Sequence, residues 1–142
     1  SQVMSGWEDD SYCIACGKEN PIGMKLDFVL TDDGIETSYV FPKIFQGYKD
    51  TVHGGMVALL LDEIMVNLPL RKDKIPAVSA DIKVKLKKPL AVGEEVLVRA
   101  KYVKTRSRFF IVKGEVIRKK DNQLIAESEA LCVRVEGKGL KL

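Results

Sequence analysis

One segment of the chain is long, almost entirely apolar and free of the two-residue alternation found around it. This segment, residues 55–68, places apolar side chains in nearly every direction around a helix. A helix that is apolar all round must be buried on all sides. Pro69 is expected to end it, because helical geometry is disfavoured for the residue before a proline. The fold therefore has to surround one central helix with other elements.

The residues on either side of this helix alternate between apolar and polar, which predicts β-strands. Two of these strands flank the turn signal Asp32-Asp33-Gly34 and form a predicted hairpin. Six strands are expected in total, at residues 24–30, 35–41, 82–86, 96–102, 109–118 and 124–135. Short turns between them favour antiparallel pairing. The pattern predicts an α+β fold in which a curved antiparallel sheet of five to six strands wraps around one long central helix.

The length and the charge of the chain limit the classes of protein to which it can belong. Its 142 residues fit a single domain, 1–142, with an irregular N-terminal leader over about residues 1–22. A net charge of +3, from 23 basic and 20 acidic residues, does not indicate a nucleic-acid binder. The apolar run is too short and too charged to cross a membrane, and the first residues lack the pattern of a signal peptide. Three cysteines, an odd number, favour a reducing compartment, so a cytoplasmic location is expected.

Two adjacent carboxylates, Asp62 and Glu63, interrupt the apolar helix. A buried carboxylate without a partner costs several kcal/mol, so each is expected to have a partner or a chemical role. Hydration at an exposed helix end is the alternative. The two side chains lie about 100° apart around the axis, so at most one faces a given cavity. A basic side chain is the expected partner of Glu63.

The sequence His53-Gly54-Gly55 lies where the helix begins. The first amide groups of a helix have no intrahelical acceptor, and the helix dipole makes them weakly positive. They suit an anion or the oxyanion of a tetrahedral intermediate. A plain tight turn into the helix is the alternative interpretation.

Several short motifs occur in a characteristic order. They are Cys13-x-x-Cys16-Gly17, Asn20-Pro21-x-Gly23, Phe45-Gln46-Gly47-Tyr48, His53-Gly54-Gly55, Leu61-Asp62-Glu63, Val78-Ser79-Ala80-Asp81 and Pro89 followed by Gly93-Glu94. In order and spacing they resemble the hotdog-fold acyl-CoA thioesterases, and the nearest branch is the phenylacetate-degradation (PaaI-like) type. The resemblance extends from about Cys13 to Val135.

This resemblance implies a site at the interface of two subunits that join their sheets edge to edge. Asp62 matches the catalytic carboxylate, as general base on water or as nucleophile on the thioester. Gly54 matches the backbone N–H that polarises the thioester carbonyl, and Ser79 matches a hydroxyl that positions the water. Asp62 and Ser79 would come from one subunit and Gly54 from the other.

Four more residues are expected to lie at the substrate: His53, Gly55, Gln46 and Gly47. An orienting role is favoured for His53, since histidines near glycine turns often bond backbone groups. Several relatives carry an asparagine six residues before the histidine, where this chain has Gly47. Gln46 is the candidate substitute for that asparagine.

The resemblance implies hydrolysis of acyl-CoA thioesters to a free acid and CoA by a homodimer or a homotetramer. No metal and no organic cofactor are expected, and no nucleic-acid or membrane partner. A non-catalytic acyl-thioester binding protein on the same fold is the alternative. A hotdog hydratase acting on enoyl thioesters is less favoured, because the histidine matches the thioesterase motif.

Two further groups of residues leave alternatives open. Basic side chains that could meet the phosphates of CoA are Lys85, Lys87, Lys88, Arg106 and Arg108, although alternating lysines are also typical of a solvated strand face. The pair Cys13 and Cys16 has half the spacing of a zinc site, and the other ligands are missing within one chain unless a second subunit supplies two more thiolates. Structural thiols are the favoured interpretation of this pair.

Overall fold

The computed structural model describes residues 7–138 of the chain. Its elements, in chain order, are β1 (Trp7–Glu8), β2 (Val29–Leu30), β3 (Gly34–Val40), the 3-10 turn η1 (Lys43–Phe45), α1 (Gly54–Asp73), β4 (Ala77–Leu86), β5 (Glu95–Thr105), β6 (Phe109–Arg118), β7 (Gln123–Arg134) and β8 (Gly137–Lys138). Within these residues, no helix combines the length and the apolar character that a bilayer crossing requires.

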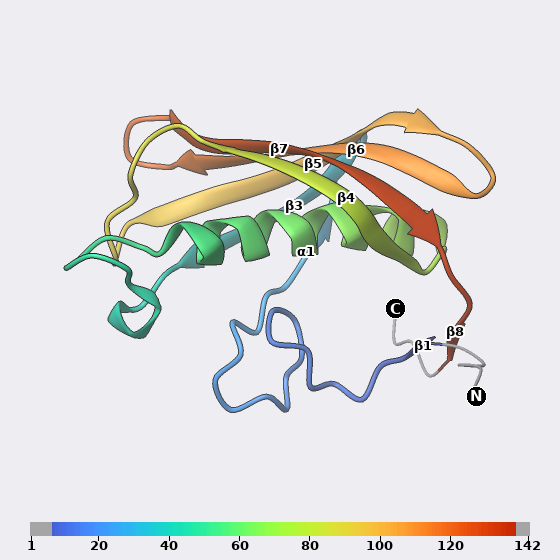
Figure 1. The fold of residues 1–142 in the computed structure, drawn as a ribbon, viewed down its shortest axis with the longest axis horizontal. Helices are drawn as coiled ribbons and strands as arrows, with labels where there is room; N and C mark the ends of the chain where they lie inside the picture. The colour runs from blue at the N-terminus through green and yellow to red at the C-terminus, as the bar shows by residue number, and fades with distance from the viewer. Residues whose placement is uncertain (1–6, 139–142) are drawn as a thin grey trace.

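Six strands form one antiparallel sheet in the order β2-β3-β5-β6-β7-β4. The sheet curves over α1, which contacts β3, β4, β5, β6 and β7 (Figure 1). The short strands β1 and β8 pair in parallel and bring the two ends of the described chain together. The predicted architecture, one helix against a curved antiparallel sheet, is confirmed.

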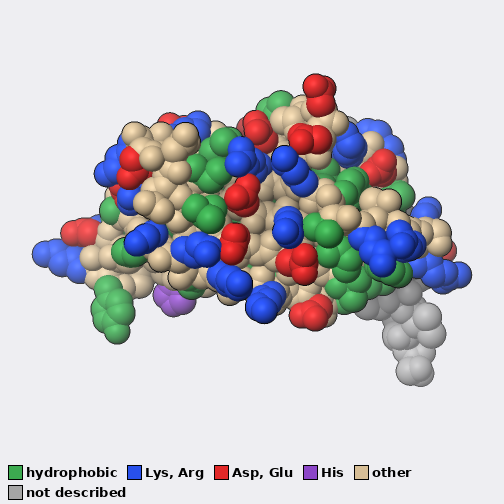
Figure 2. Space-filling view, turned by 90° about the horizontal axis from the view of Figure 1, so that it is seen from above, with side chains coloured by type: hydrophobic (Ala, Val, Ile, Leu, Met, Phe, Trp, Pro, Cys, Tyr) green, Lys and Arg blue, Asp and Glu red, His purple; other side chains and the backbone are tan. Residues whose placement is uncertain are grey.

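The outer face of the sheet, away from α1, is charged and solvated. Strand registers place Lys83 opposite Glu129 and Glu129 opposite Lys113, so the signs alternate across neighbouring strands. The view onto this face shows basic and acidic side chains interleaved (Figure 2). Opposite charges directly across a strand pair stabilise it modestly. Apolar and polar side chains therefore alternate along these strands as they do in a sheet with one buried face and one solvent-exposed face.

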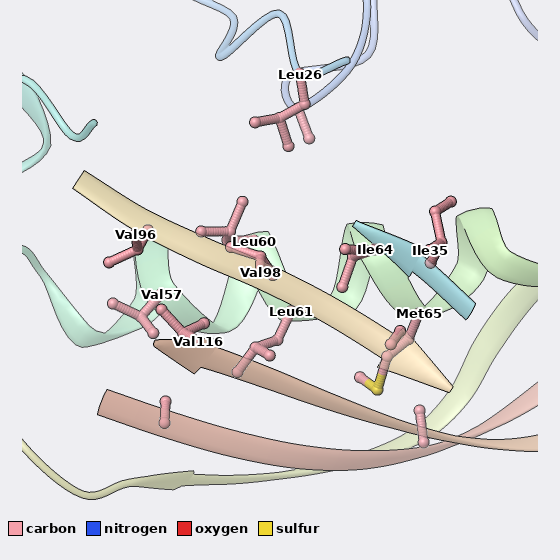
Figure 3. Packing of buried hydrophobic residues seen from close by; sticks show 14 of the residues in the cluster. Leu26, Ile35, Val57, Leu60, Leu61, Ile64, Met65, Val96, Val98 and Val116 are labelled. Atoms are coloured by element: carbon pink, nitrogen blue, oxygen red, sulfur yellow. The ribbon is translucent and has the colours of Figure 1, made fainter. Parts of the chain in front are cut away.

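The helix α1 is buried between two layers, which explains why it is apolar all round. Strands supply one layer, with Val96 and Val98 fully buried. The leader supplies the other, because Leu26 is only 3% exposed and belongs to the same core cluster as Leu60 and Ile64. In Figure 3, Leu26 comes from the leader, while Val96 and Val98 come from a strand. Figure 1 shows the helix lying between the curved sheet and the leader.

The helix continues past Pro69, where the sequence predicted its end. Pro69 lies inside α1, which ends at Asp73 with Lys74 in the left-handed conformation as its cap. Leu68 and Pro69 are both buried. A proline within a helix costs about 3 kcal/mol, so packing in the core has to outweigh the local preference. The predicted boundary was therefore wrong by one helical turn.

The predicted strand over residues 24–30 is confirmed only at its end, Val29–Leu30. Lys25 has φ of 54°, in the left-handed region, which an extended strand does not contain. The amides of Met24 and Leu26 donate to the carbonyls of Ile14 and Ala15 instead of to a strand partner. The alternation of apolar residues nevertheless identified Met24 and Leu26 correctly as buried.

Leu26→Ala should lower the free energy of unfolding by about 2–5 kcal/mol, because it removes a buried side chain that packs on α1. Ile22→Ala, in the same leader, is the matched control and should change it little, since Ile22 is 62% exposed. Denaturant unfolding of both variants at one protein concentration measures the difference. Equal effects would mean that the leader is not part of the core.

Candidate active site

His53 caps the N-terminus of α1. Its backbone is extended, and its Nδ1 accepts a hydrogen bond of 2.9 Å from the backbone N–H of Gly55. The backbone N–H of Met56 donates to the carbonyl of His53. Among the described residues, no acceptor meets the N–H of Gly54. The orienting role expected for His53 thus has a physical basis, and the amide of Gly54 is the first helical amide left available.

A small cavity of about 170 Å³ opens beside Gly54. Its lining is mostly apolar and consists of Val52, Gly54, Val57, Leu86, Lys87, Lys88, Pro89, Leu90 and Ile125. A Cβ atom on Gly54 would lie 2.8 Å from Leu86 Cδ1, so a larger residue would press into this space. The glycine therefore exposes its amide to an apolar recess, where a hydrogen bond to a developing negative charge is strong.

The carboxylate of Asp62 lies more than two turns further along α1 and is half-buried. Its Oδ1 is buried and receives no hydrogen bond from any described residue. A buried polar atom without a partner is rare and costly, so it calls for an explanation. The charge of Asp62 also reaches Cys132 on β7, because burial first and then this charge raise the pKa of the Cys132 thiol to about 11.

Ser79 lies on β4 directly opposite Cys132 on β7. Cys132 is buried in the core cluster, so this part of the register is on the side of the sheet that faces α1. A β-bulge follows, because the register shifts between Ser79 and Asp81. Ser79 thus lies opposite Cys132, whose pKa the charge of Asp62 also raises, and the placement of Asp62 and Ser79 in one site stays a prediction.

Gly54 and Asp62 do not meet within one chain. They are eight residues apart on the same helix, or about 12 Å at a rise of 1.5 Å per residue. A donor and a base acting on one thioester carbonyl both need to lie within about 3 Å of the reacting atoms. A single copy of the chain therefore holds the two halves of the expected site apart.

Gln46 and Gly47 lie beside the start of the helix. Gln46 Oε1 accepts a hydrogen bond of 3.0 Å from the backbone N–H of Asp50, which closes the loop that contains both residues. A Cβ atom on Gly47 would lie 3.4 Å from His53 Cα. The position that holds asparagine in several relatives is thus next to the cap of α1, and the carbonyl oxygen of Gln46 is occupied in its own loop.

The five basic residues predicted to meet CoA separate into three places. Lys85 and Lys87 point to the outer face of the sheet, where Lys87 Nζ lies 3.4 Å from Glu127 Oε1. Lys88 lines the cavity beside Gly54. Arg106 and Arg108 lie in the turn between β5 and β6, beyond the end of α1 where Asp73 bonds Tyr102. Within one chain, Lys87 and Lys88 are the two of the five that line this cavity.

Glu63 faces the leader, and its environment differs from the one predicted. Its Oε2 accepts a hydrogen bond of 3.3 Å from Cys13 Sγ, and among residues 7–138 it forms no ion pair with a basic side chain. The expectation of a basic partner was therefore wrong. The only sequence signal for the contact between Glu63 and Cys13 was the angle of about 100° between neighbouring helix residues. Because of this angle, Glu63 and Asp62 face different sides of the helix.

The sequence profile of the thioesterase superfamily matches residues 49–125, more than half of the chain. The chain belongs to the thioesterase superfamily. This membership indicates a thioester hydrolase. No protein of curated function matches the chain in sequence.

Solved structures with the same fold include three relatives of low identity. Zebra fish thioesterase superfamily member 2 is 19% identical with a TM-score of 0.73, over 83% of this chain and 88% of that one. The E. coli PaaI protein from the phenylacetic acid degradation operon is 14% identical with a TM-score of 0.74, over 82% and 84%. A phenylacetic acid degradation-related protein from Ralstonia eutropha JMP134 is 22% identical with a TM-score of 0.70, over 78% and 85%. The expected hotdog fold and the resemblance to this group are confirmed.

Proposed function

We propose that this thioesterase hydrolyses acyl-CoA thioesters, and that Asp62 is the base that activates water. The observation that carries the proposal is the buried Oδ1 of Asp62, which lacks a donor among the described residues. A structural carboxylate would have its buried oxygen bonded. An oxygen left free at this depth is available to accept a proton from water.

The reaction follows from two groups. Asp62 takes a proton from water as the water oxygen bonds to the thioester carbon, and the carbonyl oxygen becomes an oxyanion. The N–H of Gly54 donates to that oxyanion at the positive end of α1. When the intermediate collapses, the C–S bond breaks, and the proton held by Asp62 passes to the leaving thiolate. The products are the carboxylic acid and free CoA, and the carboxylate of Asp62 is restored.

A second copy of the chain would supply the missing half of each site. Strand β4 is a ten-residue edge strand, and its Leu86 is 56% exposed. Identical edges related by a two-fold axis pair antiparallel, which continues the sheet and keeps both helices on one side. The Leu86 end of one β4, beside Gly54, would then lie next to the Ala77 end of the other, beside Ser79. This arrangement supports a homodimer with two shared sites; pairing of dimers into a tetramer stays a prediction.

The same pairing of β4 edges also affects which basic side chains lie near the CoA part of the substrate. Lys88 lines the cavity beside Gly54. Antiparallel pairing of the two β4 edges would place Arg106 and Arg108 of the partner subunit at the end of the dimer that holds this cavity. Basic groups on both sides of the site favour an anionic carrier such as CoA. The three free thiols are compatible with the cytoplasmic location that the sequence predicts.

A binding protein without hydrolysis is the second candidate. It is favoured by one observation, the hydrogen bond that engages the carbonyl oxygen of Gln46 within its own loop. If the carbonyl contact made by asparagine in relatives is essential to turnover, this chain would bind thioesters and leave them intact. Release of free thiol from a panel of acyl-CoAs distinguishes the two functions directly.

Asp62→Asn should keep the fold and reduce turnover of acyl-CoA by at least about 100-fold, since an amide cannot take the proton from water. Glu63→Gln is the matched control on the neighbouring residue, and its loss of turnover should be much smaller because Glu63 faces the leader. Thiol release under saturating substrate measures both. Near-normal turnover by Asp62→Asn would place the base elsewhere.

Gly54→Pro should reduce turnover about 100–1,000-fold relative to Gly54→Ala, because proline removes the N–H while alanine keeps it. Proline is favoured at the first position of a helix. His53 precedes it with φ of −61° and ψ of 132°, which suits a residue before proline. Both variants place a Cβ atom near Leu86, so the comparison isolates the amide.

Mixing the inactive Gly54→Pro and Asp62→Asn proteins under conditions of subunit exchange tests whether the site is shared. Mixed dimers would contain one site with both groups intact, so thiol release should recover in part. Native mass spectrometry establishes that exchange has occurred. Mixed dimers without recovered activity would contradict a site built from two chains.

A further inference from the structure

The leader carries a cluster of metal-ligating side chains on the side of α1 opposite the sheet. Cys13 and Cys16 lie in a tight turn of the leader, and Glu63 meets them from the helix. One ligand atom from each of the three lies within 4.8 Å of the others. Cys13 Sγ and Glu63 Oε2 are 3.3 Å apart. Fifty residues of chain separate the cysteines from the glutamate, so the fold has brought these groups together.

We propose that Cys13, Cys16 and Glu63 bind a divalent metal ion of the zinc class and that this ion fastens the leader to α1. Zinc takes two thiolates and a carboxylate in tetrahedral sites, with Zn–S of about 2.3 Å and Zn–O of about 2.0–2.2 Å. Those bond lengths put neighbouring ligand atoms roughly 3.5–3.8 Å apart. The observed spacing needs only small side-chain adjustments to reach this geometry, and a water molecule completes the fourth position.

The turn that holds the two sulfur atoms is rigid. The backbone N–H of Gly17 donates to the carbonyl of Cys13 at 2.9 Å, and the N–H of Ala15 donates to Cys13 Sγ at 3.4 Å. A Cβ atom on Gly17 would lie 2.3 Å from the backbone nitrogen of Cys13 and 2.5 Å from the carbonyl oxygen of Ser11. Only glycine fits there, which explains why it follows the second cysteine. The turn therefore holds both thiols in place before any ion arrives.

The charge of the cluster favours a cation. Two thiols and a carboxylate, all half-buried, meet at this one place. Lys18, the lysine that follows this turn in the sequence, is paired with Asp27 at 2.8 Å. Over residues 7–138, Glu63 forms no ion pair with a basic side chain. A half-buried anionic group without a counter-ion costs stability, and a bound divalent ion removes that cost.

The site does not depend on the hydrolysis proposed above. Glu63 and Asp62 are neighbours that point to different sides of α1, toward the leader and toward Cys132 respectively. A metal at Glu63 would bind equally well in a catalytic and in a non-catalytic thioester binder. A disulfide between Cys13 and Cys16 is the competing use of the same two thiols, and the experiment includes it as an outcome.

The experiment uses the full chain, stripped with a chelator under reducing conditions, and adds Zn²⁺ or Co²⁺ alone. We expect one Zn²⁺ per chain by elemental analysis, and with Co²⁺ an intense near-ultraviolet thiolate charge-transfer band. The thermal midpoint should rise with Zn²⁺ concentration, because the ion binds the folded state. These measurements on the unaltered protein need no variant that might fail to fold.

Three variants assign the ligands. Cys13→Ser, Cys16→Ser and Glu63→Gln should each weaken Zn²⁺ binding by at least about 10–100-fold in competition with a chromophoric chelator. Cys132→Ala, which removes the remote third thiol, should bind normally. Absence of the charge-transfer band from the reduced protein would overturn the proposal, as would a Cys13–Cys16 disulfide that persists when Zn²⁺ is present. Unchanged affinity in folded Glu63→Gln would overturn the three-ligand site.

Discussion

Coverage of α1 on two sides, by the sheet and by the leader, is the constraint on which the rest of the structure depends (Figure 1). The sheet covers one side of the helix and the leader covers the other, so Leu60, Leu61 and Ile64 are all fully buried. In such a helix, a polar side chain costs stability unless it has a partner. The two carboxylates in the middle of α1 are therefore the informative residues of the chain. The groups that each carboxylate faces indicate the role of that side of the helix.

The helical repeat gives these two neighbours different environments. Asp62 lies toward Cys132 and the sheet, with one buried oxygen that receives no donor within the described chain. Glu63 lies toward the leader, where Cys13 donates to it. One side of the helix thus carries an acceptor that is still free for a substrate or water, and the other carries a group engaged by sulfur. Under the two proposals, one helix would carry both a reaction site and an attachment point for the leader, on different sides.

Much of the fold could be predicted, because alternation and an all-apolar helix are local signals of burial. The strand at Phe109–Arg118 matched its predicted range, and the helix was found with its start one residue away. Pro69 and the segment around Lys25 were mispredicted because tertiary packing and the leader's hydrogen bonds outweigh local preference there. The contact of Glu63 with Cys13 spans fifty residues and has no periodic signature. The candidate site residues could be named from their motifs, and the resemblance placed Gly54 and Asp62 in different subunits. The structure adds the distance of about 12 Å that separates them along one helix.

The separation of Gly54 and Asp62 has a consequence for assembly. Both residues belong to one continuous helix, packed on both sides, so no loop movement or hinge within a chain can shorten the distance of about 12 Å between them. If both act on one thioester, the second group has to come from another copy, and the exposed edge of β4 is where such a copy can continue the sheet. Catalysis and self-association would then be one property: the dimer is the smallest unit in which a donor and a base can meet. A chain of this fold that remained monomeric could retain Asp62 and Gly54 and still lack a complete site.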